Sequence, residues 1–174
     1  MVIRYTHPLA ILACILSLHS PAYAQPALPA NFHVAPMYIE FVEAIADHSP
    51  TFEGQLRRIA TAPGVAVYVD IVARVMGARA RTRMVRETDG LTAWIEVARL
   101  DNVVELIAHE VEHVIEQIDR IDLAGGAGMA DSGIYSVSAR GTAFETVRAA
   151  RAGVSVAREV ARSKEREPAY VLDQ

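Results

Sequence analysis

The hydrophobic pattern changes character along the first hundred residues. Between residues 37 and 47 apolar side chains recur at helical spacing, and Ser49-Pro50 has the residue types that cap and open a second helix, to about residue 60. From residue 65 onward apolar positions alternate, and Asp89-Gly90 is a typical hairpin turn between strands at 80–87 and 91–98. We therefore expect two helices followed by a small, mostly antiparallel sheet of about three strands.

Helical spacing returns in the second half of the chain. Residues 102–122 are predicted to form one helix, with Asn102 as its N-cap and Glu105 as the partner of that cap. A Gly- and Ser-rich loop over residues 124–140 then leads to a last helix over residues 142–163. Helices, a small sheet and two further helices together predict an α+β fold.

The first 24 residues have the pattern of a secretion signal. Arg4 precedes an apolar core, residues 9–18, that is too short to span a bilayer. Ala22-Tyr23-Ala24 supplies the small residues that signal peptidase reads, so we expect cleavage after Ala24 and export to the periplasm or the medium. A lipid anchor at Cys14 is the alternative.

The rest of the chain is predicted to be a single domain with short extensions. Residues 25–36, which include three prolines, are predicted to be an extended arm. Residues 37–163 form the domain, and residues 164–174 a polar C-terminal tail. No later stretch has about 18 consecutive apolar residues, so we expect no membrane span in the mature chain.

Composition and charge exclude several classes of function. The chain has 174 residues and a formal net charge of −4, so it lacks the basic character that nucleic-acid binding requires, and we expect no nucleic-acid partner. Its single cysteine, Cys14, lies in the predicted signal, which leaves no disulfide or thiolate site in the mature chain. The candidate chemistry must therefore come from imidazoles and carboxylates.

His109-Glu110-Val111-Glu112-His113 is an HExxH pattern on the helix predicted over residues 102–122. Residues i and i+4 share one face of a helix, so both imidazoles can reach one Zn²⁺. Glu110 lies to the side of that face, where it can act as a general base on metal-activated water. The apolar residues of this helix cluster on the opposite face, and the alternative is that the histidines and glutamates are ordinary side chains on a solvated face.

Glu145 is the predicted third ligand. On the helix predicted over residues 142–163 it shares a side with the small residues Ala149 and Ala152, and a second face of that helix is apolar. We therefore expect the helix to be buried on two sides. A carboxylate is costly there unless it is paired or bound to a metal, and a salt bridge from Glu145 to an arginine is the alternative.

An HExxH helix followed by a glutamate with alanine four residues on resembles the gluzincin branch of zinc metallopeptidases, and the size and element order resemble its compact, minimal members. The resemblance covers roughly residues 91–163. It implies a zincin-like domain with one Zn²⁺ per chain. It also implies His109, His113 and Glu145 as metal ligands and Glu110 as the catalytic base. A peptide or protein substrate would be aligned along an edge strand, a place that the resemblance gives to residues 91–98.

The chain also departs from the family's pattern. Glu112 places a negative charge where family members usually have an uncharged residue. Glu116 stands where the metzincin branch has a glycine turn, and Asp119 stands at that branch's third-ligand position, but a continuing helix should carry Asp119 away from the metal. The family's transition-state stabiliser has no clear match, and Tyr135 and Arg148 are the candidates.

We therefore predict an exported zinc metallopeptidase-like hydrolase in which metal-activated water attacks a peptide bond and Glu110 carries the proton. Two alternatives stay open. One is a non-catalytic metal-binding module, a pseudo-enzyme that recognises a partner. The other is a helical protein-interaction domain without a metal.

Overall fold

The computed structural model describes residues 28–138 and 142–166, so the predicted secretion signal, its cleavage site and Cys14 lie outside the described residues, as do parts of the predicted arm and tail. The described chain is α+β, as the sequence predicted. Its elements are, in chain order, β1 (Phe32–Val34), a 3-10 helix η1 (Pro36–Tyr38), α1 (Ile39–His48), α2 (Pro50–Thr61), β2 (Val65–Val72), β3 (Ala80–Arg86), β4 (Leu91–Ala98), α3 (Val103–Ile118), α4 (Leu123–Gly126), β5 (Ile134–Ser136), β6 (Phe144–Thr146) and α5 (Val147–Arg166).

The main sheet is mixed, and the prediction of a mostly antiparallel sheet is wrong. Its strand order is β1-β2-β4-β3. β1 pairs with β2 and β2 pairs with β4 in parallel, whereas β3 and β4 form the antiparallel hairpin that Asp89-Gly90 predicted. β5 and β6 form a separate antiparallel pair. A short turn sequence is enough to predict an antiparallel hairpin. A parallel pairing joins strands that are far apart in the chain, so local sequence does not predict it.

β4 is a central strand, and β3 is the edge strand. Every second residue of β4 is buried and the residues between them are half-buried, so both faces of this strand are at least partly covered. β3 alternates half-buried and exposed positions and carries three arginines, a composition that suits a strand with one free edge. The expectation that residues 91–98 form an edge strand is therefore wrong, and that position belongs to Ala80–Arg86.

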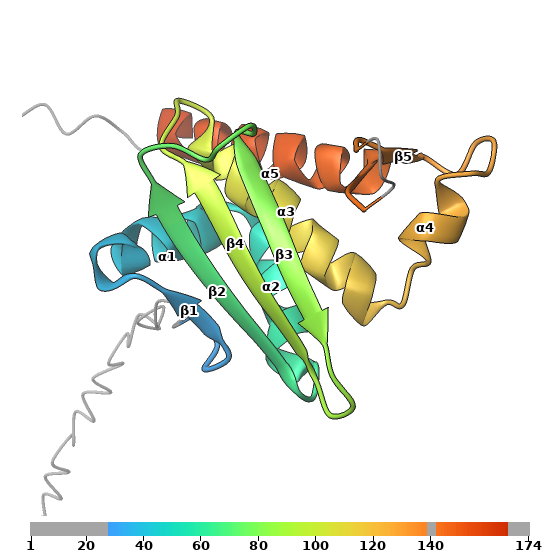
Figure 1. Ribbon diagram of the computed structural model, residues 1–174. Coiled ribbons are helices and arrows are strands. Elements are labelled where there is room, and N and C mark those ends of the chain that lie inside the picture. The colour runs from blue at the N-terminus through green and yellow to red at the C-terminus, as the bar shows by residue number, and fades with distance from the viewer. Residues whose placement is uncertain (1–27, 139–141, 167–174) are drawn as a thin grey trace, which may run out of the picture.

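The helices α1, α2, α3 and α5 lie on one side of the main sheet, and the other face carries no helix in the part of the chain that the structure describes (Figure 1). The core lies between the two layers. As the helical pattern predicted, Ile107, Val111 and Val114 of α3 are fully buried there. Among the described residues, none of the helices combines the length and apolar character needed to cross a membrane.

The arm predicted over residues 25–36 contains the strand β1, which the sequence pattern did not predict. Phe32 is buried in the core, and β1 pairs along β2. The side-chain amide of Asn31 donates hydrogen bonds to the backbone carbonyls of Ile59 (2.8 Å) and Val65 (3.0 Å). These contacts add the segment to the sheet as its other edge strand.

The two predicted helix caps have different outcomes. Ser49 caps α2 as predicted, because its hydroxyl accepts the backbone N–H of Phe52 at 3.1 Å. Asn102 occupies the N-cap position of α3 as predicted, but its side chain makes no capping hydrogen bond, so the predicted capping pair with Glu105 does not form. The backbone of Asn102 (φ −102°, ψ 27°) lies outside the extended region from which a cap side chain reaches back to the helix.

The first of the last two predicted helices ends earlier than expected, and the second begins later. The helix predicted over residues 102–122 ends at Ile118, and α4 and β5 lie in the region that was expected to be an irregular loop. The helix predicted over residues 142–163 begins only at Val147, after the strand β6. The hydroxyl of Thr146 accepts the backbone N–H of Ala149 at 2.9 Å and so caps α5 at this point.

α3 and α5 pack closely, and Gly153 permits the approach. A Cβ atom on Gly153 would lie 2.7 Å from the backbone carbonyl oxygen of Glu105 and 3.2 Å from the Cβ atom of His109. α5 therefore runs directly beside the helix turn that carries the first histidine of the HExxH pattern.

Candidate metal centre

The polar face of α3 is buried rather than solvated. Glu110, Glu112 and His113 are buried, and Glu116 has no exposed surface. The expectation that this face could be an ordinary solvated surface is therefore wrong, because α5 and the β5–β6 hairpin pack around it. Buried carboxylates and imidazoles need partners, and those partners define the site.

His109, His113 and Glu145 come together in one group of potential metal ligands. The Nε2 atom of His109 lies 2.8 Å from Oε2 of Glu145 and 3.2 Å from Nε2 of His113. The third side of the triangle, from Nε2 of His113 to Oε2 of Glu145, is 3.6 Å. Ligands about 2.0–2.1 Å from a tetrahedral Zn²⁺ lie about 3.3–3.4 Å from one another, so the three distances bracket the spacing that zinc requires.

Glu145 reaches this group from a strand, not from the predicted helix. It lies in β6, one residue before Thr146, and its side chain is 44% exposed. The argument that Glu145 lies on a helix buried on two sides is therefore wrong, although the residue does lie beside both imidazoles. Its ion-pair partners among the described residues are His109 and His113, and not the arginine of the alternative reading.

His113 is held in position by a chain of hydrogen bonds that links α3 to the start of α5. Its Nδ1 atom lies 2.8 Å from Oε2 of Glu116. The other oxygen of Glu116 accepts a hydrogen bond from the hydroxyl of Thr146. A proton on Nδ1 leaves Nε2 free to bind a metal, and a carboxylate behind a histidine ligand fixes the ring's orientation. The same chain holds β6, and with it Glu145, against the imidazoles.

The electrostatics of the group are those of a cation site. Hydrogen bonds from His109 and His113 lower the pKa of Glu145 to about 2. Burial by itself lowers the pKa of His113, but the hydrogen bonds to Glu116 and Glu145 outweigh burial and raise it to about 9. Without a metal, a proton on His113 therefore supplies the positive charge that the two carboxylates stabilise.

Glu110 faces a cavity beside the ligand group. Its Oε2 atom accepts a hydrogen bond of 2.6 Å from the hydroxyl of Thr82 on the edge strand β3. Burial raises its pKa above the ordinary value. The cavity measures about 270 Å³, and its lining includes Glu110, His113, Glu145 and residues of β3. A buried carboxylate with a raised pKa at such a place has the properties of a general acid or base.

Glu112 of α3 and Asp119 just after it have charged partners outside the ligand group. Glu112 accepts hydrogen bonds from Gln55 (2.6 Å) and from Arg148 (2.6 Å), so its charge is balanced by that guanidinium. Asp119 forms ion pairs with Arg58 and with Arg148 (2.9 Å). These pairs explain how the chain accommodates Glu112, and they confirm that Asp119 does not join the ligands.

The two candidates for a transition-state stabiliser have different positions. Arg148 is engaged with Glu112 and Asp119 and makes no contact with the ligand group among the described residues. Tyr135 pairs directly across the β5–β6 hairpin from Glu145, and its side chain is exposed. Directly paired residues in an antiparallel hairpin point to the same face, so Tyr135 is the one that the fold brings near the site.

The sequence patterns missed the two threonines that support the site. Thr82 contacts Glu110 from the edge strand, and Thr146 contacts Glu116 from the end of β6. Thr82 left no signal, because a threonine is an ordinary residue in a strand. Thr146 did leave one: threonine is a favoured N-cap residue, and its position would have moved the predicted helix start beyond Glu145.

The ligand atoms of His109, His113 and Glu145 indicate which metal ion would fit the site. Two imidazole nitrogens and one carboxylate oxygen are typical of catalytic zinc centres that keep a fourth position for water.

Comparison of the chain with known protein families, with curated proteins and with solved structures finds no match. The candidate site therefore rests on its own geometry and chemistry.

Proposed function

We propose that this chain is an exported zinc-dependent metallopeptidase-like hydrolase. The observation that carries the proposal is the triangle of Nε2 of His109, Nε2 of His113 and Oε2 of Glu145, with sides of 2.8, 3.2 and 3.6 Å. Glu110, on the same helix, lines the cavity that His113 and Glu145 also line. An α+β domain with an edge strand beside its HExxH helix supports a zincin-like arrangement.

His109, His113 and Glu145 would hold the zinc ion, which supplies Lewis acidity toward a water molecule and a carbonyl group. Glu110 takes a proton from the attacking water and later donates it to the leaving amine. The raised pKa of Glu110 brings this carboxylate closer to the pH at which it must exchange that proton. Thr82 orients the carboxylate through its 2.6 Å hydrogen bond.

The edge strand β3 is the proposed place for the substrate. β3 pairs with β4 on one side only, so the N–H and C=O groups on its other side can bind an extended peptide. Residues of this strand, including Thr82 and Met84, line the same cavity as Glu110. A peptide added along β3 would therefore pass the ligand group.

A non-catalytic metal module is the second candidate, and the ligand count weighs against it. Structural zinc sites are closed by four protein ligands, whereas catalytic sites have three and leave one position open. Within the described residues the group contains three ligands. A purely structural zinc site would not require a buried carboxylate such as Glu110 that faces the cavity without binding the metal.

The decisive experiment separates metal binding from catalysis. Glu110→Gln keeps the size of the side chain but removes the base, so the variant should retain one zinc ion per chain while hydrolysis of a quenched-fluorescence peptide library falls by about 10²–10⁴-fold. Glu145→Gln and His113→Ala should lower the zinc affinity itself. Glu105→Gln, on the same helix, is the matched control and should change neither quantity.

The outcomes distinguish the candidates. Zinc binding by the wild type with no hydrolysis of the library at any pH from 5 to 9 would favour the non-catalytic module. Zinc content that is unchanged in both His113→Ala and Glu145→Gln would remove the metal centre altogether. Hydrolysis that survives Glu110→Gln would refute the role of Glu110.

A further inference from the structure

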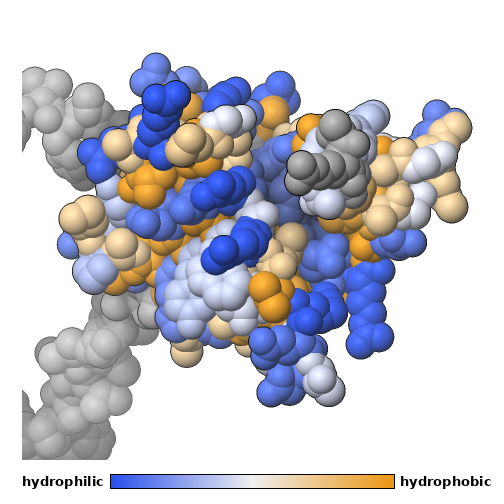
Figure 2. All heavy atoms as spheres, in the orientation of Figure 1, coloured by the Kyte–Doolittle hydropathy of each residue, from blue (hydrophilic) through white to orange (hydrophobic). Residues whose placement is uncertain are grey.

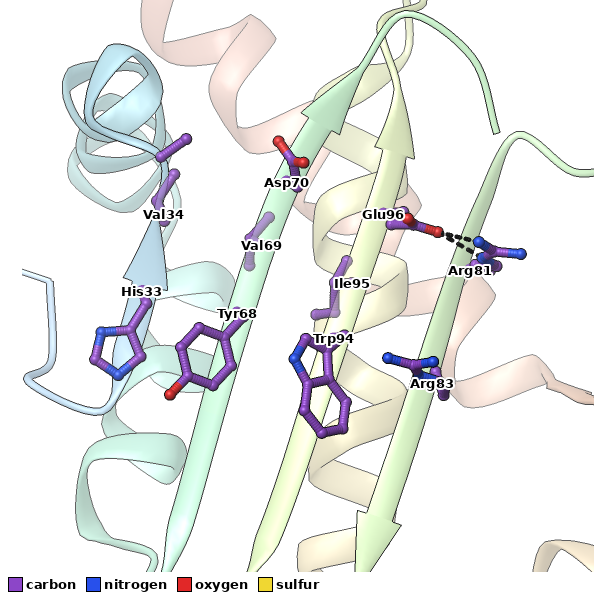
Figure 3. A pocket seen from close by; sticks show the side chains of 11 residues that line it. His33, Val34, Tyr68, Val69, Asp70, Arg81, Arg83, Trp94, Ile95 and Glu96 are labelled. Atoms are coloured by element: carbon purple, nitrogen blue, oxygen red, sulfur yellow. Dashed lines mark hydrogen bonds and ion pairs between the residues drawn. The ribbon is translucent and has the colours of Figure 1, made fainter. Parts of the chain in front are cut away.

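The open face of the main sheet carries a row of aromatic side chains across the strands. His33, Tyr68 and Trp94 occupy directly paired positions on β1, β2 and β4, and Arg83 on β3 pairs with Trp94. Figure 3 shows these four side chains in one row on the face that no helix covers. The row is independent of the metal ligands, which lie on the other side of the sheet.

The three rings are nearly parallel and stack in steps along the row. The rings of His33 and Tyr68 are 4.7 Å apart between centroids and inclined by 22°, and those of Tyr68 and Trp94 are 6.3 Å apart and inclined by 15°. The guanidinium of Arg83 lies 4.9 Å from the centre of the Trp94 ring. Tyr68 is 43% exposed, and Figure 3 shows the faces of the rings turned outward. We call these four residues the aromatic platform.

The aromatic platform is the floor of a large hollow. The cavity measures about 740 Å³ and is also lined by Asp70, Glu96 and Arg81, from the next row of paired positions. Figure 2 shows pale and orange side chains, of intermediate and high hydropathy, gathered on this face among hydrophilic groups. A cavity of this size is typical of small-molecule or oligomer binding sites.

The polar groups around the hollow show which chemistry it would recognise. Glu96 is paired with Arg81, but Asp70 and Arg83 have no ion-pair partner among the described residues. Two carboxylates and two guanidiniums give the hollow no net charge, so it does not attract a polyanion such as single-stranded nucleic acid. It therefore offers ring faces together with an available acceptor, Asp70, and an available donor, Arg83.

We propose that the aromatic platform binds a neutral oligosaccharide. The C–H face of a pyranose ring is flat and carries partial positive charge, which complements the negative face of an aromatic ring. Sugar hydroxyls donate and accept hydrogen bonds, which matches the carboxylate of Asp70 and the guanidinium of Arg83. A peptide is disfavoured here, because the backbone groups of the sheet are already paired within it and only side chains face this surface.

The edge strand separates the aromatic platform from the candidate metal centre. Thr82 points to Glu110 on the helix side, whereas its neighbours Arg81 and Arg83 face the hollow. A sugar on the platform would thus lie on the open face of the sheet, and a peptide would lie along the free edge of β3, next to the metal centre on the helix side. The proposal does not depend on the proposed hydrolase activity.

The test uses the intrinsic fluorescence of the purified protein. Trp94 is the single tryptophan of the chain, so its emission reports directly on the platform. We expect a saturable change with at least one of three neutral hexasaccharides, namely cellohexaose, maltohexaose and N-acetylchitohexaose. Tyr68→Ala should weaken this binding about tenfold by removing one ring face. Asp70→Asn, an isosteric surface change that should not affect folding, should also weaken it.

The controls decide where any binding occurs. Tyr135→Ala removes an exposed tyrosine from the β5–β6 hairpin and should leave sugar affinity unchanged. No fluorescence change with any of the three sugars up to millimolar concentration would overturn the proposal. Binding of a thymidine oligonucleotide but of no sugar, or a dimer that dissociates in Tyr68→Ala, would also overturn it. Sugar affinity that is unchanged in both Tyr68→Ala and Asp70→Asn would place the site elsewhere.

Discussion

Thr146→Val tests whether the hydrogen-bond chain behind His113 holds the candidate site together. Valine keeps the branched shape of threonine but lacks the hydroxyl. That hydroxyl donates to the carboxylate of Glu116, which has no exposed surface, and accepts the backbone N–H of Ala149 at the start of α5. The substitution therefore removes two interactions while changing the volume of the core very little.

The magnitude follows from these two contacts. A hydrogen bond to a buried charged group contributes about 1.5–3 kcal/mol, and an N-cap about 1 kcal/mol. Because the two contacts share one oxygen atom and are not independent, we expect a loss of about 2–4 kcal/mol in the free energy of unfolding. For a chain of this size the melting temperature should fall by about 5–15 °C. Zinc affinity should fall about 10–100-fold, because Glu116 no longer orients His113 firmly.

Two measurements check these values. Urea unfolding of the zinc-free protein, followed by Trp94 fluorescence, gives the free energy of unfolding, and competition with a zinc-binding dye gives the affinity. Thr61→Val is the matched control, because the Thr61 hydroxyl is exposed and bonds the backbone carbonyl of Arg57 at 3.0 Å. It should change stability by less than about 0.5 kcal/mol. A Thr146→Val variant that behaves like this control in both assays would refute the reasoning.

Three further predictions concern packing, pH and export. Gly153→Ala should destabilise the protein by about 1–2 kcal/mol in urea unfolding, because the clash of its Cβ with the carbonyl of Glu105 exceeds the gain of about 1 kcal/mol in helix propensity; a more stable variant would contradict the close packing of α3 and α5. His113 has a pKa of about 9 in the folded, zinc-free protein and 6.5 as its ordinary value, so its stabilising contribution is complete below pH 6.5 and is lost as the pH rises through 9. Urea midpoints of the zinc-free protein should therefore fall between pH 6.5 and pH 9.5, while zinc affinity rises over the same range because His113 must lose its proton to bind; flat profiles would contradict this. Protein recovered from an exporting host should have an intact mass that begins at Gln25, and a lipid on Cys14 would contradict cleavage after Ala24.

Local sequence determined most of the helices and strands of this protein. Apolar spacing predicted α1 and the core face of α3, and Ser49-Pro50 predicted α2. The Ser49 cap and the Asp89-Gly90 turn are confirmed. The spacing of the HExxH pattern also determined that His109 and His113 share one helix face. These features depend on residues within a few positions of one another, so a single segment is enough to specify them.

Tertiary structure decided how these segments meet. The insertion of β4 between β2 and β3, and the parallel pairing of β1 and β2, depend on which distant strands share a hydrophobic face. The same packing covers the polar face of α3 and so buries Glu116. A local pattern gives the periodicity of a strand but not its neighbour, which is why the sheet was predicted to be mostly antiparallel.

In the candidate site, too, some features follow from local sequence and others only from tertiary structure. Glu145 was identified from a helix pattern that does not apply to it, because Thr146 caps α5, which begins only at Val147, and Glu145 lies in the strand before it. It reaches His109 and His113 because β6 is tied to α3 through Glu116. His33, Tyr68 and Trp94 become neighbours only through strand register, since pairing across a sheet joins residues that are far apart in the chain. The sequence supplied the reactive groups, and the pairing of distant segments decided which of them lie within bonding distance.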